Sequence, residues 1–385
     1  MIRRMRVAID GKRYYLNSSG IGRYSRSLID QLNIIGDEEN LELFLYRPKG
    51  KVKFEPKYHS HLTEITADYL FPGHIGNAIW RFTKLPSLIN NNEYDLFHGP
   101  SHVLPGKLKC PSVVTMLDLI FIRYPNYFKA WDRNYYRISF KKSAQLADHI
   151  ISISEATKAD LINFFGIKED KISVIYPGFD AVFSKLQQQK LDEIKIKFKL
   201  PRDYILYVGN IEPRKNILKL AQAFNSLQES SHIDKDVHLL IVGQKGWYYK
   251  EIIDGIDSLS SRDKIKLVGP VYGEDLVGVY QLATIMAYPS MFEGFGYPVL
   301  EAMRLGTPVL TSNISSMPEV GGNAAHYVNP ESLDEIKDGL CKLLNDKNYR
   351  EKLAVKGTRH AAGFNTMRMA QETLEVYRKL IIKNI

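Results

Sequence analysis

The sequence contains little cysteine and no long apolar run. Cys110 and Cys341 are the only cysteines among 385 residues, and neither lies in a metal-ligand spacing. This usage is typical of a reducing cytoplasm and excludes a disulfide framework. No apolar run approaches the roughly 20 residues that a membrane-spanning helix needs, and the opening MIRRMRVAIDG lacks the apolar core of a signal peptide. We therefore expect a cytoplasmic protein.

The sequence also lacks the motifs of several enzyme and binding classes. No Ser/His/Asp, Cys/His or HExxH arrangement is present, and neither zinc spacing nor an RNP-type aromatic motif indicates nucleic-acid binding. The one Asp-x-Asp motif, Asp234 to Asp236, precedes an expected strand and favours a solvated loop over a set of metal ligands. We therefore expect no metal, no cofactor and no nucleic-acid partner.

Positive charge is unevenly distributed along the chain. The formal net charge is +9, and residues 1–178 hold 25 Lys and Arg against 18 Asp and Glu. Such a field attracts anionic partners, among them lipid headgroups and phosphorylated acceptors.

Residues 123–142 combine cations with aromatic side chains. On a helix from residue 129 they occupy two faces, with Arg133, Arg137 and Lys141 on one and Trp131, Tyr135 and Ile138 on the other. Basic and aromatic faces suit peripheral binding to an anionic membrane surface. The alternative, which we favour from the sequence, is a helix that packs its aromatic residues into the core.

Two series of short apolar strands alternate with amphipathic helices, as in parallel sheets covered on both faces. The first series comprises residues 6–10, 41–46, 95–98, 111–117 and 149–154; the second comprises 204–209, 238–243, 265–269, 284–290 and 308–312. A polar run follows Gly178, and 385 residues exceed what one core usually supports. We expect two doubly wound α/β domains of Rossmann type, spanning 1–178 and 179–365, followed by a last helix in 366–385.

Residues 290–301, SMFEGFGYPVLE, are the most informative stretch, because Glu293 and Glu301 bracket a glycine-rich turn between two expected strands. Pro298 suits the start of a helix, and Gly294 and Gly296 let several backbone N–H groups approach one point. A helix N-terminus attracts a phosphate, and carboxylates accept hydrogen bonds from hydroxyl groups. A phosphate flanked by polyols describes a nucleotide sugar. The alternative for either glutamate alone is a solvated side chain.

Cations lie where another helix is expected to begin. In VGNIEPRKN, residues 208–216, Arg214 and Lys215 precede a helix that starts near Asn216. Cations oppose the helix dipole there, so a bound anion would explain them. A solvated basic turn is the alternative.

Other polar residues follow strands of the first series. Gly20 and Gly22 precede a helix, and their backbone amides are expected to lie near a diphosphate, although Ser25 breaks the dinucleotide fingerprint. Asp118 and His98 end two of the strands, at the sheet edge where doubly wound folds bind ligands. A capping aspartate and a structural histidine are the alternatives.

Taken together, these blocks resemble the retaining family 4 (group 1) glycosyltransferases, and among them the mannosyltransferases. The resemblance rests on Glu293 to Glu301, PRKN at 213–216, SEATKADL at 154–161, YPGFD at 176–180 and TSNISSMPEVGGNAA at 311–325. It implies a GT-B architecture in which two Rossmann-like domains face a cleft. The domain of residues 1–178 would bind the acceptor, 179–365 would bind the nucleotide sugar, and the helix in 366–385 would cross back to the first domain.

The resemblance also assigns roles. Glu301 would bind the nucleotide ribose, Glu293 the transferred hexose, and Arg214 and Lys215 the diphosphate. The residues expected in catalysis are Glu293, Arg214, Lys215 and Asp118. The residues expected to bind the donor are Gly20, Gly22, Asn210, Arg214, Lys215, Glu293, Gly294, Phe295, Gly296, Tyr297, Pro298, Val299 and Glu301.

One position departs from the family. Many relatives read His-Asp where this chain reads Leu117-Asp118, which leaves Asp118 or His98 as substitutes for the missing histidine. The expected activity is metal-independent transfer of a hexose to a saccharide or lipid-linked saccharide acceptor in surface polysaccharide synthesis. The donor expected first is GDP-mannose, which would supply mannose. The alternatives are a nucleotide-sugar epimerase of the same fold and a retired transferase that binds carbohydrate or scaffolds a partner.

Overall fold

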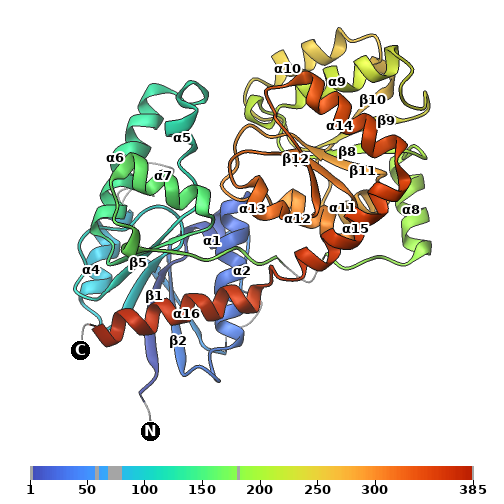
Figure 1. Cartoon of the computed structure of the whole chain (residues 1–385). Helices are drawn as coiled ribbons and strands as arrows, with labels where there is room; N and C mark the ends of the chain where they lie inside the picture. Colours follow the sequence, from blue (N-terminus) through green and yellow to red (C-terminus); the bar gives the residue numbers. More distant parts are fainter. Residues whose placement is uncertain (1–2, 57–59, 68–79, 180–182, 384–385) are drawn as a thin grey trace. The chain divides into compact units, whose positions relative to one another are not determined.

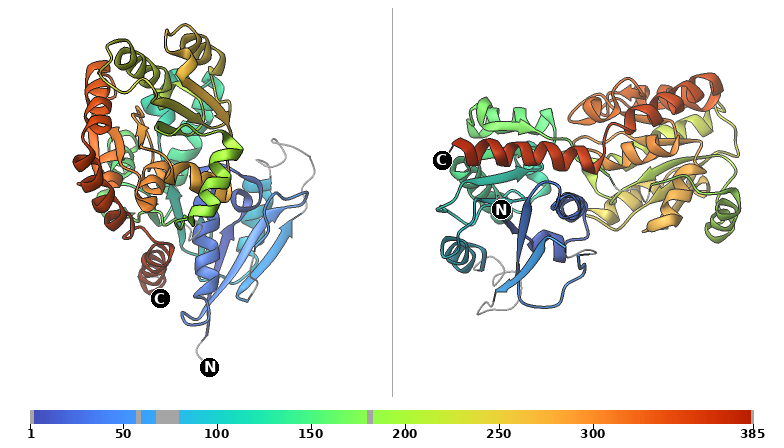
Figure 2. Two further views of the ribbon diagram at one scale, coloured as in Figure 1. Left: turned by 90° about the vertical axis from the view of Figure 1, so that its right-hand side faces the viewer. Right: turned by 90° about the horizontal axis from the view of Figure 1, so that it is seen from below.

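The computed structural model describes residues 3–56, 60–67, 80–179 and 183–383. The chain divides into two compact units, Met1–Phe179 with Phe364–Ile385, and Asp180–Gly363. Each unit contains one parallel β-sheet with helices on both faces (Figures 1 and 2). The predicted class, two Rossmann-like α/β domains, is confirmed. Asp180, which ends the YPGFD block, lies outside the described residues.

The first unit is built on a 7-stranded sheet of order β3-β2-β1-β4-β5-β6-β7. Its strands are β1 (Met5–Asp10), β2 (Leu41–Pro48), β3 (Leu62–Ala67), β4 (Leu96–Gly99), β5 (Ser112–Met116), β6 (His149–Ser152) and β7 (Ile172–Val174). Its α-helices are α1 (Lys12–Leu16), α2 (Gly20–Ile34), α4 (Leu85–Asn90), α5 (Ile120–Arg123), α6 (Ala130–Leu146), α7 (Glu155–Phe165) and α16 (Thr366–Lys383). A π-helical turn, Trp80–Lys84, precedes α4.

The second unit is built on a 6-stranded sheet of order β10-β9-β8-β11-β12-β13. Its strands are β8 (Tyr204–Val208), β9 (His238–Val242), β10 (Ile265–Gly269), β11 (Ile285–Tyr288), β12 (Val309–Ser312) and β13 (Ala325–Val328). Its α-helices are α8 (Gln188–Phe198), α9 (Ile217–Glu229), α10 (Tyr249–Asp257), α11 (Gly273–Gln281), α12 (Tyr297–Leu305), α13 (Met317–Gly321), α14 (Leu333–Asn345) and α15 (Lys347–Ala361).

The strand order creates a topological switch point in each sheet. In the first unit β1 pairs with β2 on one side and β4 on the other, and in the second unit β8 lies between β9 and β11. The chain winds outward from β1 and from β8 in one direction and then in the other, so the loops after the two central strands separate. Ligands of doubly wound sheets bind in the crevice that this separation leaves at the carboxyl ends of the strands.

Helix α16 completes the first unit, although it is the last element of the chain. It lies across that unit beside α2 (Figure 1). Met369, Leu374 and Tyr377 are buried at helical spacing, which is the core packing that their spacing predicts. A Cβ on Gly178 would come within 2.3 Å of the Thr366 backbone nitrogen. The chain therefore leaves the first unit and returns to it at neighbouring points.

Candidate active site

Two loops of the second unit meet at its switch point. One follows β8 and carries Arg214 and Lys215 in a 3-10 turn, Pro213–Lys215, directly before α9. The other follows β11 and carries Glu293 before α12. The predicted order of strand, glycine-rich turn, helix and strand is confirmed for residues 285–312.

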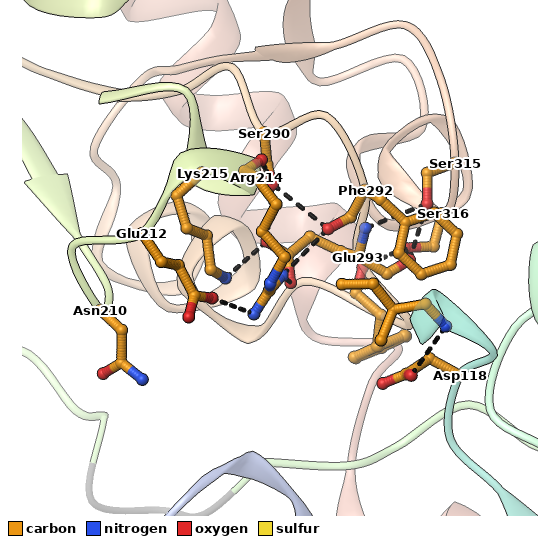
Figure 3. A network of polar contacts seen from close by, with 12 residues as sticks. Asp118, Asn210, Glu212, Arg214, Lys215, Ser290, Phe292, Glu293, Ser315 and Ser316 are labelled. Carbon is orange, nitrogen blue, oxygen red and sulfur yellow. Dashed lines mark hydrogen bonds and ion pairs between the residues drawn. The ribbon is translucent and has the colours of Figure 1, made fainter. Parts of the chain in front are cut away.

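Glu293 joins the two loops through ion pairs with both cations (Figure 3). Its Oε2 lies 2.9 Å from Nη1 of Arg214, and its Oε1 lies 2.5 Å from Nζ of Lys215. All three residues are largely withdrawn from solvent, since the exposed fractions of their side chains are 10%, 23% and 8% respectively. A solvated Glu293 and a solvated basic turn are both excluded.

Neutral donors and a second carboxylate complete this network. Ser290 Oγ and the Tyr288 hydroxyl donate to Glu293 Oε1 over 2.7 and 3.0 Å. Lys215 also donates to the Tyr288 hydroxyl, and Nη2 of Arg214 lies 2.7 Å from Oε1 of Glu212. The sequence interpretation missed Glu212, Tyr288 and Ser290. The sequence did hold a signal for them, because all three residues lie inside or beside the blocks 208–216 and 290–301.

The electrostatics of the network hold Glu293 ionised. Burial alone would raise the pKa of Glu293, but the charges of Arg214 and Lys215 outweigh burial and lower that pKa to about 2. Burial, followed by repulsion from Arg214, lowers the pKa of the Lys215 ammonium. Glu212 and Glu293 formally balance the two cations, so an anionic ligand here must compete with the carboxylates for them.

The loop that carries Glu293 is fixed by two serines from the segment after β12. Ser315 Oγ donates to the Glu293 carbonyl over 2.7 Å and accepts from the Glu293 amide, while Ser316 Oγ donates to the Phe295 carbonyl over 2.6 Å. Gly296 has φ 124°, and a Cβ there would come within 2.4 Å of Met317 Cε. Only glycine fits this turn.

Helix α12 begins directly after this turn. The amides of Gly294 and Gly296 make no hydrogen bond within the described part of the chain, whereas the Val299 amide donates to the Gly296 carbonyl. Phe295 is buried, and Tyr297 and Pro298 form the half-buried first turn. Backbone donors therefore remain at a helix N-terminus beside the ion-pair network, an arrangement that binds phosphate groups.

Glu301 lies one turn into α12 and is only 4% exposed. Its Oε2 accepts a hydrogen bond of 2.8 Å from the hydroxyl of the buried Tyr280. A solvated Glu301 is therefore excluded. The Asn210 side chain, by contrast, lies exposed in the loop after β8, near the network in Figure 3.

Comparison with known proteins identifies the family. Residues 18–183 match the model "Glycosyltransferase Family 4", and residues 188–360 match "Glycosyl transferases group 1". The chain is a glycosyltransferase of these families. The predictions of the family and of a hexosyltransferase are confirmed.

Curated relatives and solved structures agree with this result. The enzyme is 28% identical to O-antigen chain mannosyltransferase B of Escherichia coli over 94% of this chain and 96% of that protein. It is 31% identical to O-antigen chain mannosyltransferase RfbU of Salmonella typhimurium over 63% of this chain and 66% of that protein. Sucrose-phosphate synthase from Thermosynechococcus elongatus has the same fold, with a TM-score of 0.80, 20% identity and coverage of 99% of this chain and 100% of that one. Anabaena HepE in complex with UDP and glucose follows, with a TM-score of 0.73, 19% identity and coverage of 98% and 100%. The fold is therefore of the GT-B type.

The first unit of the glycosyltransferase contains the remaining predicted residues. Asp118 follows β5, and its Oδ1 accepts the Ile120 amide over 3.2 Å, as a turn or capping aspartate does (Figure 3). Gly20 opens α2 next to open space, whereas a Cβ on Gly22 would overlap the Asn17 carbonyl oxygen at 1.9 Å. The Gly22 amide donates to Asn17 Oδ1 over 3.1 Å, so this donor is already engaged inside the unit.

The interpretation of His98 as a structural histidine is confirmed, and His98 does not substitute for the missing histidine. His98 is 0% exposed, and its two ring nitrogens lie 2.6 Å from the Tyr377 hydroxyl and 2.8 Å from Thr115 Oγ1. Burial lowers its pKa to about 3, so the ring is neutral. His98 therefore links α16 to β5 and is structural.

The second histidine of FHGPSH was missed and lies at the sheet edge. His102 Nε2 accepts the Leu117 and Asp118 amides over 3.2 and 3.3 Å, which places the ring proton on Nδ1. The ring stacks on Phe140 of α6 with a centroid distance of 4.4 Å. Burial, with smaller contributions from Arg13 and Arg81, lowers its pKa to about 3. His102 thus fixes the backbone at Leu117, the position where this chain departs from the His-Asp of many relatives.

The favoured interpretation of α6, aromatic residues packed into the core, is wrong for its Trp131 face. Trp131, Tyr135 and Ile138 are 83%, 40% and 69% exposed. The helix buries Phe140 and Ala144 instead, and Tyr136 packs against Phe140. An apolar stripe therefore faces solvent, next to the exposed cations of the same helix.

Neither a metal centre nor a membrane-spanning helix is found among the described residues. No group of three or more His, Cys, Asp or Glu side chains could hold a metal ion there. No described helix has the length and apolarity to span a membrane.

Proposed function

We propose that this glycosyltransferase moves mannose from GDP-mannose, with retention of anomeric configuration and without a metal ion, to a saccharide or lipid-linked saccharide in surface polysaccharide synthesis. Two relatives named as O-antigen chain mannosyltransferases support the sugar and the pathway class. The observation that carries the proposal is the buried Arg214–Lys215–Glu293 network at the switch point of the second unit.

In the proposed donor complex, Arg214 and Lys215 bind the diphosphate together with the backbone amides of Gly294 and Gly296. Arg214 presents several donors on one plane and keeps Glu212 as a fixed partner, while Lys215 supplies a point charge. Glu293 then exchanges part of its ion pairing for hydrogen bonds from the hexose hydroxyls. Glu301 accepts hydrogen bonds from the ribose, while its Oε2 continues to accept one from the Tyr280 hydroxyl. No cofactor takes part.

In the proposed reaction, the bond from the anomeric carbon to the diphosphate oxygen breaks, and the acceptor oxygen bonds to that carbon on the same face. The acceptor hydroxyl passes its proton to the departing diphosphate. Positive charge from Arg214 and Lys215 stabilises the negative charge that develops on that leaving group. Asp118 of the first unit orients the acceptor in this scheme.

The donor is tested by product analysis. We expect transfer from GDP-mannose to exceed transfer from UDP-glucose, UDP-galactose and UDP-N-acetylglucosamine, and Glu301→Gln to weaken GDP binding by about tenfold, the value of one hydrogen bond to a charged group. Mass spectrometry of the products and calorimetry with GDP measure both quantities. An epimerised nucleotide sugar formed without acceptor would indicate the epimerase instead, and GDP binding without any turnover would indicate a retired transferase.

We also propose that the enzyme acts at the cytoplasmic face of a membrane through α6. The exposed stripe of Trp131, Tyr135 and Ile138 suits the lipid interface, and the cations beside it suit anionic headgroups. Each Lys or Arg near such a surface contributes about 1 kcal/mol.

Replacing the α6 cations is expected to abolish most vesicle binding. The variant carries Gln at Arg133, Arg137, Lys141 and Lys142. The matched control carries Gln at four exposed cations of α15, Lys347, Lys352, Lys356 and Arg359. Cosedimentation with anionic vesicles at low salt should fall sharply for the first variant only, while transfer to a soluble acceptor persists. Equal binding by both variants, or no binding by the wild type, would refute this role of α6.

A further inference from the structure

The first unit contains a second cluster of cations, which no step of the proposed donor binding uses. Arg81, from the π-helical turn before α4, is 5% exposed and lies with its Nε 2.6 Å from Oδ2 of Asp10. Lys12 and Arg13 belong to α1, which begins directly after β1 and Asp10. The Lys12 amide donates to Asp10 Oδ1 over 3.0 Å. The cluster therefore lies at the carboxyl end of the central strand.

The cations of this cluster are close enough to repel one another. Burial and then the Arg81 charge lower the pKa of Lys12 to about 8, and the same two causes lower the pKa of Arg13. Asp10 is the one carboxylate that opposes these shifts among the described residues. Asp10 is ion-paired with Arg81 alone among these cations, and the cluster of three cations and one carboxylate has a formal charge of +2 when Lys12 is protonated.

Two of the guanidinium groups are also incompletely hydrogen-bonded. Nη2 of Arg81 and Nε of Arg13 are buried and have no hydrogen-bond partner within the described residues. A buried charge without its full set of partners destabilises the fold, since desolvation is not offset. Such an arrangement is typical of a site whose missing partner is a ligand.

The position of the cluster agrees with that interpretation. β1 and β4 flank the switch point of the first sheet, where doubly wound folds bind ligands. Arg13 and Arg81 lie near enough to His102, which fixes the Leu117 and Asp118 amides, to lower its pKa, and the phenol side chains of Tyr135 and Tyr136 on α6 lie near Arg13. The cluster therefore faces the loop after β5 as well as the inner side of α6.

We propose that Lys12, Arg13 and Arg81 form an anion site that binds the phosphate or diphosphate group of the acceptor. The assignment to an acceptor rests on the proposed transferase function, whereas the anion site follows from the cluster itself. A glycosyl phosphate and a lipid-linked glycosyl diphosphate share the required chemistry. Arg81 keeps its orientation through Asp10 and offers the unpaired side of its guanidinium to the anion.

The test removes two cations that are not paired with the buried Asp10 side chain. Lys12→Gln/Arg13→Gln is compared with Lys107→Gln/Lys109→Gln, which removes the same charge from exposed positions of the same unit. Three probes are titrated by calorimetry with GDP at saturation: a hexose 1-phosphate, a short-chain prenyl diphosphate-linked hexose, and a methyl hexoside. Binding of GDP alone tests the donor site separately, so its failure would count against the proposed function and not against the anion site.

We expect the wild type and the control variant to bind the two phosphorylated probes more tightly than the methyl hexoside. Lys12→Gln/Arg13→Gln should weaken binding of the phosphorylated probes by about a hundredfold, roughly tenfold for each charge-assisted contact. Tighter binding of the diphosphate probe would assign the site to a lipid-linked acceptor, and equal binding of both would assign it to any glycosyl phosphate.

Two further readouts separate ligand binding from folding. Removing like charges should leave the melting temperature of the unliganded variant at or above that of the wild type, and Arg13→Lys, which keeps the charge, should retain most of the affinity. Unchanged affinity of the folded double variant for both phosphorylated probes would overturn the proposal. So would an equal loss in the control variant.

Discussion

Glu293→Ala is expected to lower the free energy of unfolding by about 3 to 5 kcal/mol, the usual cost of removing one partner from a buried ion pair. The physical reason is that Arg214 and Lys215 would keep their buried charges and lose the carboxylate that both of them contact. Thermal and urea unfolding of the second unit measure this effect. Glu251→Ala, at an exposed glutamate of α10, is the matched control and should change stability by less than about 0.5 kcal/mol.

The same residue gives the stability a defined pH dependence. The folded-state pKa of Glu293, about 2, lies below its ordinary value of 4.5. Its contribution is therefore fully present above pH 4.5 and is lost as the pH falls from 4.5 towards 2. Glu293→Gln should remove this part of the acid dependence, worth about 3 kcal/mol. A variant as stable as the wild type at pH 7, with the same acid profile, would contradict the buried network.

The central strands of both sheets could be predicted from the sequence, but three edge strands could not. β8 is a continuous apolar run, and β1 contains the buried apolar run Val7 to Ile9, because both faces of these strands are covered. β3, β7 and β13 are short or partly polar, with exposed or half-buried positions, because each lies at or near a sheet edge with less to cover it. A local hydrophobic pattern therefore carries little signal for them.

Local residue patterns alone predicted the candidate site only as separate halves, and the family resemblance was needed to join them. The glycine turn and the PRKN block each indicated an anion site from their own local chemistry. The pairing of Lys215 with Glu293 joins residues 78 positions apart, and local spacing holds no information about such a contact. For the same reason the sequence left His98 open as a site residue, because its partner Tyr377 lies 279 positions away.

For helix α6, the sequence predicted which residues share a face but not which face is buried. Its spacing placed Trp131, Tyr135 and Ile138 correctly on one face, but periodicity does not state whether that face meets the core or solvent. The side that is buried depends on Phe121 and His102, which pack against Phe140 from other segments. The tertiary structure of the first unit is therefore needed to decide whether the Trp131 face is buried or exposed.

In the proposed mechanism, Arg214 and Lys215 stabilise a departing nucleoside diphosphate. Arg214→Ala and Lys215→Ala are each expected to lower kcat for mannose transfer by about a hundredfold, the typical loss when one preorganised charge at a developing anion is removed. Lys235→Ala, at an exposed cation of the same unit, is the control and should keep its rate. Circular dichroism and the melting temperature verify that each variant is folded.

Initial rates of transfer from saturating GDP-mannose to a soluble acceptor test this claim most directly. The predicted result is a loss of about a hundredfold in kcat for each folded variant, with a rate near that of the wild type for the control. Folded Arg214→Ala and Lys215→Ala enzymes that both transfer at wild-type rates would contradict the assignment of this network to the leaving group.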